Sequence, residues 1–345
     1  FFLYNETVFK ESNMITFESD YVEGCHEAIL ERFKETNYEQ LSGYGNDHYT
    51  VSAKEKIKKA CKNDNVDVHF LSGGTQTNQI VIDSMLQSYQ GVICCSTGHI
   101  AVHEAGAIEF TGHKVLTVPS HLGLMHACDL EQYLQNFYED GTCTHMVQPG
   151  MVYITYPSEY GTLYTKKELK EIHDVCSKYH LPLFLDGARL GYGLMSPASD
   201  IDMHDLTELT DVFYIGGTKI GALIGEAVVF THHNTPECFF TSIKQHGALL
   251  AKGRVLGITF DTLFTDDLYL SISKHAIDMA MKVKQAFIEK GYKLFMDSYT
   301  NQQFIILDKE QMERISKTVH FEIWEKVDDA HYAVRFATSW ATKEE

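Results

Sequence analysis

The sequence predicts an α/β protein with a largely parallel sheet covered by helices on both faces. Strand-like and helix-like segments alternate through the middle of the chain, an order typical of such sheets. The 345 residues are too many for one small module and suit one large domain with a smaller companion. With 44% apolar residues and only six prolines, the chain can bury a substantial core.

The elements follow from periodicity and from turn residues. In the helix expected over 166–179, Leu169, Ile172, Cys176 and Tyr179 recur at steps of three and four residues, so one side belongs to the core. Helices are also expected over 77–89 and 101–110. Strands are expected over 66–71, 91–95, 114–119, 151–155, 181–186, 212–215 and 226–231.

The pattern changes after about residue 250. A long helix over 266–290 ends at Gly291, which suits the left-handed position that follows a helix. Short strands are expected over 303–307, 320–325 and 333–336. This part predicts a smaller α/β lobe.

Charge and composition exclude several classes of protein. Lys plus Arg number 29 against 47 Asp plus Glu, a net charge of −18 with no basic run, so nucleic acid is not expected as a partner. No run approaches the ~20 apolar residues that span a bilayer, and Phe1–Lys10 lacks the features of a signal peptide. The eight cysteines form no Cys-x-x-Cys pair, which predicts reduced thiols in a cytoplasm and no metal site.

A glycine-rich turn follows the first expected strand. Gly73, Gly74 and Thr75 precede a helix, where backbone N–H groups and the helix dipole favour a phosphate. The alternative is a plain turn in which Thr75 caps the helix. No P-loop or Gly-x-Gly-x-x-Gly motif is present, which disfavours nucleoside triphosphates and dinucleotides.

Asp186 ends an apolar strand-like run, where a carboxylate needs a partner. Arg189, three residues later, is one candidate and a protonated ring nitrogen of a cofactor is the other. Lys219 lies between two apolar strands in a loop of small residues. It is either a solvent-facing lysine on a tight turn or a poorly solvated amine that attacks a carbonyl.

His99 follows the strand over 91–95, where its ring could stack on a flat ligand or simply occupy a loop. Pyridoxal 5'-phosphate needs a phosphate cradle, an acid and an amine together, and one such cofactor explains all three. The set resembles the threonine aldolase and β-eliminating lyase group of fold-type-I pyridoxal phosphate enzymes. The resemblance rests on the runs Phe17–Asp20, Tyr44–Asp47, Gly73–Asn78, His99–Gly106, Asp186–Arg189, Thr218–Ile220 and on Arg335.

The resemblance implies the residues that hold the cofactor. Lys219 would form the Schiff base and Asp186 would pair with the pyridinium nitrogen. Gly74 and Thr75 would hold the phosphate, and His99 would stack on the ring. Each assignment rests on a position that matches the family's motif.

The resemblance also implies how the substrate is held. Ser19 and Arg335 would bind its carboxylate, and Arg189 would lie near the ring hydroxyl or the substrate. His99 or His145 would act as the base that takes the proton of a β-hydroxyl group. The segment over 156–162 departs from the Glu-Asn-Thr-His of typical members.

A neighbouring subunit is expected to complete the site. In this family a loop of the partner brings a positive charge to the phosphate, and Lys252 or Arg254 would serve here. Tyr44 is a further contributor from the neighbour. We therefore expect a homodimer or homotetramer with active sites at subunit interfaces.

The fold and activity implied by the resemblance are specific. The expected large domain covers 16–248 and contains a mostly parallel seven-stranded sheet; 249–345 is the small C-terminal domain, and 1–15 is an arm. The expected reaction is retro-aldol cleavage of threonine or allo-threonine to glycine and an aldehyde. A β-eliminating lyase, an aminotransferase and a non-catalytic scaffold of the same fold are the alternatives.

Overall fold

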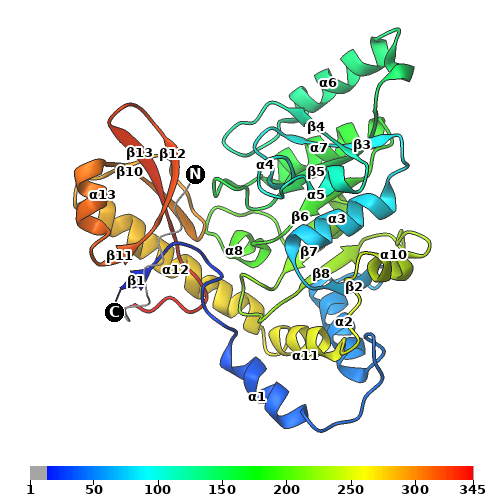
Figure 1. Ribbon diagram of the computed structural model, residues 1–345, viewed down its shortest axis with the longest axis horizontal. Coiled ribbons are helices and arrows are strands. Elements are labelled where there is room, and N and C mark those ends of the chain that lie inside the picture. Colours follow the sequence, from blue (N-terminus) through cyan, green and yellow to red (C-terminus); the bar gives the residue numbers. More distant parts are fainter. Residues whose placement is uncertain (1–13, 345) are drawn as a thin grey trace.

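A seven-stranded sheet forms the centre of the computed structural model, which describes residues 14–344 (Figure 1). The strand order is β2-β8-β7-β6-β5-β3-β4, and all neighbours pair in parallel except β8, which is antiparallel to β7 and β2. The predicted mostly parallel sheet is confirmed. Its strands are β2 (Asp67–Leu71), β3 (Gln90–Cys95), β4 (Lys114–Val118), β5 (Gln148–Thr155), β6 (Leu183–Asp186), β7 (Val212–Gly216) and β8 (Glu226–Phe230).

Different helices cover the two faces of this sheet, as predicted. Side chains alternate along each strand, so Tyr153 joins one apolar cluster while Val152 and Ile154 join the other. The Tyr153 face packs against α3 (Gly74–Met85), α5 (Ala107–Phe110) and α10 (Phe239–Gln245). The other face packs against α1 (Glu27–Thr36), α2 (His48–Cys61), α6 (Ala127–Glu139), α7 (Lys166–Lys178), α9 (Met203–Leu209) and α11 (Arg254–Leu263).

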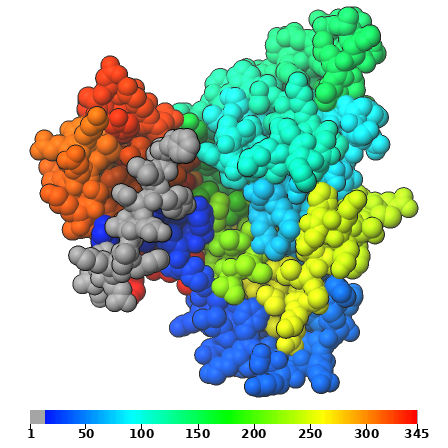
Figure 2. Space-filling model, in the orientation of Figure 1, coloured from blue at the N-terminus to red at the C-terminus, as the bar shows by residue number. Residues whose placement is uncertain are grey.

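A second, antiparallel sheet lies to one side, and Figure 2 shows its orange and red residues as a separate bulge. Its order is β12-β13-β10-β9, with α12 and α13 packed against β10. Although α12 has 22 residues, no helix within 14–344 combines the length and apolar character that crossing a membrane requires. The elements are α12 (Leu268–Glu289), β9 (Lys293–Leu294), β10 (Gln302–Asp308), α13 (Lys309–Ile315), β12 (Glu322–Lys326) and β13 (His331–Ala337).

The N-terminal segment connects the second sheet to the first. β1 (Ile15–Thr16) pairs with β11 (Val319–His320). Phe17 donates its backbone N–H to the His320 carbonyl, and its own carbonyl accepts from the N–H of Ala337. The chain then reaches the large domain at Asp20, whose carboxylate accepts a hydrogen bond from Arg189, three residues after the end of the central strand β6. Of the expected arm, residues 1–13 lie outside the described residues, and the domain boundary at 248/249 stays a prediction.

Three expected elements differ in detail. The helix over 101–110 is two short helices, α4 (His99–Val102) and α5, because Ala105 and Gly106 adopt positive φ. The strand over 320–325 is divided between β11 and β12, which belong to different sheets. Helix α3 begins at Gly74, three residues earlier than expected, and the residue before it, Gly73, makes no side-chain cap, so the capping alternative for Thr75 was wrong.

Two glycines let the loops after β6 and β7 come together. A Cβ on Gly187 would lie 2.0 Å from the Tyr214 carbonyl oxygen, and one on Gly216 would lie 2.2 Å from that of Ala188. Gly216 donates its N–H to the Gly187 carbonyl at 2.9 Å. This contact brings the segments that carry Asp186 and Lys219 side by side.

We therefore predict that Gly187→Ala destabilises the protein. The added methyl group must push the two backbones apart, at a cost of about 1–3 kcal/mol. The measurement is the thermal unfolding midpoint. Gly141→Ala is the matched control, because nothing lies within 4 Å of the added atom there; an equal midpoint for both variants would contradict the role of the contact.

Candidate active site

A cavity of about 380 Å³ opens where the parallel strands end. The chain reaches it through the segments that follow β2, β3, β5, β6 and β7, as expected for ligand sites of parallel sheets. The segment after β5 contributes Pro157 and Glu159. Six residues predicted from the sequence line this one cavity, namely Gly74, Thr75, His99, Asp186, Arg189 and Lys219.

Lys219 lies in the tight loop between β7 and β8. Its carbonyl accepts a hydrogen bond from the Tyr192 hydroxyl at 2.6 Å, and its ammonium lies 5.8 Å from the centre of the Tyr21 ring. Burial, together with the charge of Arg189, lowers the pKa of Lys219 to about 8, although nearby carboxylates oppose the shift. About a tenth of this amine is therefore neutral at pH 7, far more than of a lysine with the ordinary pKa.

Asp186, the last residue of β6, is 2% exposed and held by three donors. The Tyr153 hydroxyl donates to Oδ2 at 2.6 Å, the Asn78 amide donates to the same oxygen at 3.0 Å, and the Ala188 N–H donates to Oδ1 at 2.9 Å. This carboxylate is fixed in orientation before any ligand arrives.

Arg189 does not pair with Asp186, so that alternative was wrong. Its guanidinium binds Asp20 through Nε at 2.6 Å and Nη2 at 3.0 Å. Burial alone would raise the pKa of Asp20, but the charges of Arg189 and Lys219 and the hydrogen bonds from Arg189 and Asn301 together outweigh it and lower the pKa to about 2. The pair leaves Asp186 free to meet a cation from another molecule.

His99 is oriented from two sides. Its Nδ1 lies 2.7 Å from Oε1 of Glu104, which also accepts from the Asn78 amide at 2.7 Å. Its backbone N–H donates to Glu159 at 2.9 Å. Because an ionised carboxylate only accepts, the His99 proton sits on Nδ1 and leaves Nε2 as an acceptor.

The first turn of α3 offers an anion site. The helix begins at Gly74, and the first N–H groups of a helix have no partner within it. A Cβ on Gly74 would lie 3.2 Å from the Tyr214 hydroxyl, so glycine keeps this entrance open. The cradle suits a phosphate group.

Other predicted residues lie elsewhere. Arg335 is 6% exposed on β13, where Gln302, Glu322 and the Glu18 carbonyl hold its guanidinium. Ser19 is buried, and its hydroxyl has no partner within the described residues. Neither lines the cavity in this conformation.

Four more predicted residues lie outside the cavity of their own chain. His145 sits in the 3-10 helix η1 (Cys143–His145). Tyr44 and the Lys252–Arg254 loop lie side by side, joined by a backbone hydrogen bond from Tyr44 to Ala251 at 3.0 Å. The Arg254 guanidinium donates to the Glu39 and Asn37 carbonyls.

Several site residues were given no role from the sequence. Asp20, Asn78 and Glu104 lie within the motifs that carry the family resemblance, and only their contacts reveal what they do. Glu226 lines the cavity and accepts the Gly217 N–H at 2.9 Å. Burial raises the pKa of Glu226 to about 7. Its place at the start of β8 gave no chemical signal.

The donor set fits pyridoxal 5'-phosphate. An amine of lowered pKa, a fixed carboxylate and a helix N-terminus converge on one cavity, and these are the three contacts that the cofactor requires. Asp186 has no cationic partner among the described residues. A protonated ring nitrogen would supply one.

Known proteins resemble the chain over nearly its whole length. A low specificity L-threonine aldolase of Pseudomonas sp. (strain NCIMB 10558) is 29% identical over 340 residues, covering 95% of this chain and 93% of that protein. A solved threonine aldolase of Leishmania major is 40% identical with a TM-score of 0.92, covering 96% of this chain and 95% of that one.

A more distant solved structure shares only the fold. The histidinol-phosphate aminotransferase of Clostridium acetobutylicum is 12% identical with a TM-score of 0.70, covering 94% of each chain. The family model of the beta-eliminating lyases matches residues 16–310. This chain therefore belongs to the beta-eliminating lyase family.

Proposed function

We propose that this chain is a pyridoxal phosphate-dependent carbon–carbon lyase of the threonine aldolase type. It cleaves threonine or allo-threonine to glycine and acetaldehyde. The observation that carries the proposal is the convergence of Lys219, Asp186 and the first turn of α3 on one cavity. The 40% identity to a threonine aldolase over almost the whole chain supports the choice of reaction.

Each group has a defined task. When bound, pyridoxal phosphate supplies an electron-accepting ring that stabilises negative charge at the substrate Cα. The fixed carboxylate of Asp186 would pair with the protonated ring nitrogen of the cofactor. The N–H groups of Gly74 and Thr75 would bind its phosphate. Lys219 provides the amine that attaches the cofactor. Tyr153 and Asn78 keep Asp186 in place.

His99 is the proposed base for the β-hydroxyl proton. It lines the cavity, whereas His145 does not line the cavity of its own chain. Glu104 fixes the proton on Nδ1 and stabilises the imidazolium that forms when Nε2 takes a second proton. Removal of the hydroxyl proton directs the break to the Cα–Cβ bond.

Arg335 and Ser19 are the proposed site for the substrate carboxylate. Arg335 lies on β13 of the second sheet, where burial together with the charge of Arg189 lowers its pKa. A carboxylate clamp on this side fixes which Cα bond stands perpendicular to the cofactor ring. Glu322 and Gln302 hold the arginine until then.

A partner subunit is proposed to complete the site. What supports this proposal is that Tyr44, Lys252 and Arg254 lie together and away from the cavity of their own chain; in a homodimer or homotetramer they would serve the cavity of a neighbour. We also propose a cytoplasmic location for the protein, since all eight cysteines are free thiols.

The substrate profile tests the proposed reaction. Threonine or allo-threonine should yield acetaldehyde and glycine in equal amounts, with no keto-acid acceptor needed. The aldehyde is followed by coupled reduction, and ammonia and pyruvate are measured in parallel. Pyruvate and ammonia from serine or cysteine without aldehyde would indicate a β-eliminating lyase, and dependence on a keto acid would indicate an aminotransferase.

Lys219 should carry the cofactor. We expect the purified protein to be yellow, and borohydride followed by peptide mass spectrometry should place the label on Lys219. Lys219→Ala should be colourless while keeping the circular dichroism of the parent. A label on Lys284, whose ammonium is held by Ser298 and Asp297, or on any other lysine would refute the assignment.

Cofactor uptake should depend on the protonation of Lys219. Only the neutral amine attacks an aldehyde, and with a pKa of about 8 its fraction rises about tenfold between pH 7 and pH 9. The initial rate of uptake by cofactor-free protein should rise by that factor and then level off. Nα-acetyl-lysine is the control for the cofactor's own titration, and its rate should keep rising beyond pH 10. Parallel profiles would contradict a lowered pKa.

A further inference from the structure

A second group of chemically active side chains lies in the loop between β4 and α6 and in the first turn of that helix. His121, His126 and Asp129 each offer one ligand atom, and these atoms all lie within 4.8 Å of one another. Among the residues that the structure describes, this is the one group of three or more His, Cys, Asp or Glu side chains gathered closely enough to hold a metal ion. The mechanism above uses none of the three.

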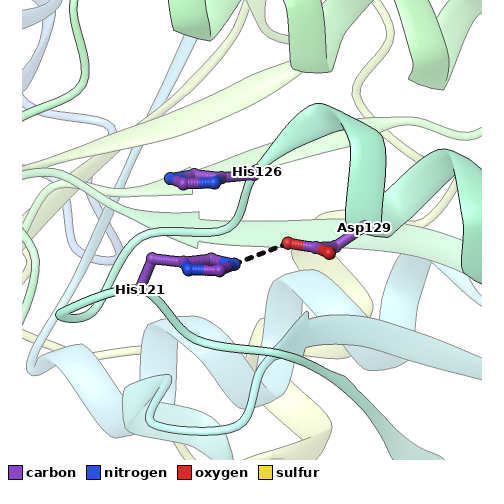
Figure 3. A group of neighbouring side chains, drawn as sticks. All are labelled: His121, His126 and Asp129. Carbon is purple, nitrogen blue, oxygen red and sulfur yellow. Dashed lines mark hydrogen bonds and ion pairs between the residues drawn. The ribbon is translucent and has the colours of Figure 1, made fainter.

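The loop is folded so that the two imidazoles meet. Leu122 and Gly123 both adopt positive φ, and the turn closes through backbone hydrogen bonds between His121 and Leu124 at 2.9 and 3.2 Å. The rings of His121 and His126 are stacked with centroids 3.9 Å apart and planes 3° from parallel, as Figure 3 shows.

Each ligand is available in a different way. Nε2 of His121 lies 2.7 Å from Oδ2 of Asp129, which sits in the first turn of α6 (Figure 3). His126 precedes that helix but makes no side-chain cap, so its ring nitrogens are not used there. Both histidines are exposed and Asp129 is half-buried, which leaves room for water ligands.

We propose that His121, His126 and Asp129 bind one divalent transition-metal ion. Two imidazoles and one carboxylate suit Zn²⁺ and ions of similar character, with water in the remaining positions. With neutral imidazoles the group carries one negative charge, which attracts a dication.

The site closes by small side-chain movements. Ligand atoms around a tetrahedral zinc ion lie about 3.3 Å apart, given bonds of roughly 2.0–2.1 Å. The atoms now within 4.8 Å must approach by about 1.5 Å at most, and rotation of the two exposed histidine side chains can supply that movement without moving the backbone. For Nε2 of His121 to coordinate the ion, the ring proton must be on Nδ1, so the proton between Nε2 and Asp129 moves to Nδ1 of the same ring through solvent.

The metal loop (residues 120–129) contacts two segments that carry active-site residues. The Leu122 carbonyl accepts from the Thr162 hydroxyl at 2.8 Å, and the Ser120 hydroxyl lies 2.6 Å from that of Thr97. Thr97 precedes His99, and Thr162 ends the segment that carries Glu159 into the cavity. Bound metal therefore braces both segments.

Calorimetric titration of ZnCl₂ into the cofactor-loaded protein, without amino acids, tests the proposal. We expect one Zn²⁺ per chain, with affinity at least tenfold lower in His126→Gln and in Asp129→Asn. Zinc should raise the thermal midpoint of the parent but not of His126→Gln. Equal affinity in the parent and both variants would overturn the assignment.

Two control variants distinguish zinc binding at this site from zinc binding by a nearby thiol or by another exposed histidine. Cys128→Ser should bind zinc like the parent, and its loss of binding would replace the proposed ligands by a thiolate. His331→Gln should also bind normally, because His331 is an exposed histidine paired with Asp328 that has no second imidazole. X-ray absorption of the zinc-loaded parent should show two imidazoles, and a spectrum without them would also refute the site.

Discussion

The close approach of two backbones after β6 and β7 is the constraint on which the site depends. Gly187 and Gly216 bring carbonyl groups to distances that any side chain would block. Asp186 ends one strand, and Lys219 follows the other by three residues. Since parallel strands end at the same edge, this contact turns two separate loops into one cavity wall. The carboxylate and the amine then face the same small volume.

The surroundings of the cavity shift the pKa values of two buried carboxyl groups in opposite directions. Among the acids, Asp20 is held at a pKa of about 2 by Arg189, whereas burial raises the pKa of Glu226 to about 7. The two have opposite effects on folding. The Asp20 contribution is present above the ordinary pKa of a carboxyl group and is lost as pH falls through about 2. Burial of Glu226 destabilises the fold progressively as pH rises from 4.5 to about 7.

The arginines of the site pair with residues that are distant in the sequence, not with the acid nearest to them along the chain. Arg189 stands three residues from Asp186, yet it pairs with Asp20, 169 positions away. That pairing ties the N-terminal segment to the large sheet and spares Asp186 for a cofactor. Arg335 has a comparable anchor in Glu322 on the neighbouring strand β12. The acidic partner that already binds each arginine therefore decides which other groups the arginine can contact.

Local patterns in the sequence predicted the alternating elements, the helices on both faces of the sheet and the positions of Gly74, Asp186 and Lys219 at or just after strand ends. These follow from periodicity and from turn residues, which act over a few positions. The three-dimensional structure was needed to identify the partner of Arg189, the position of His145 outside the cavity of its own chain, the place of Glu226 within that cavity, and the stacking of His121 on His126. Such contacts depend on how segments that are distant in the sequence come together in space, and a pattern that extends over a few residues does not determine this.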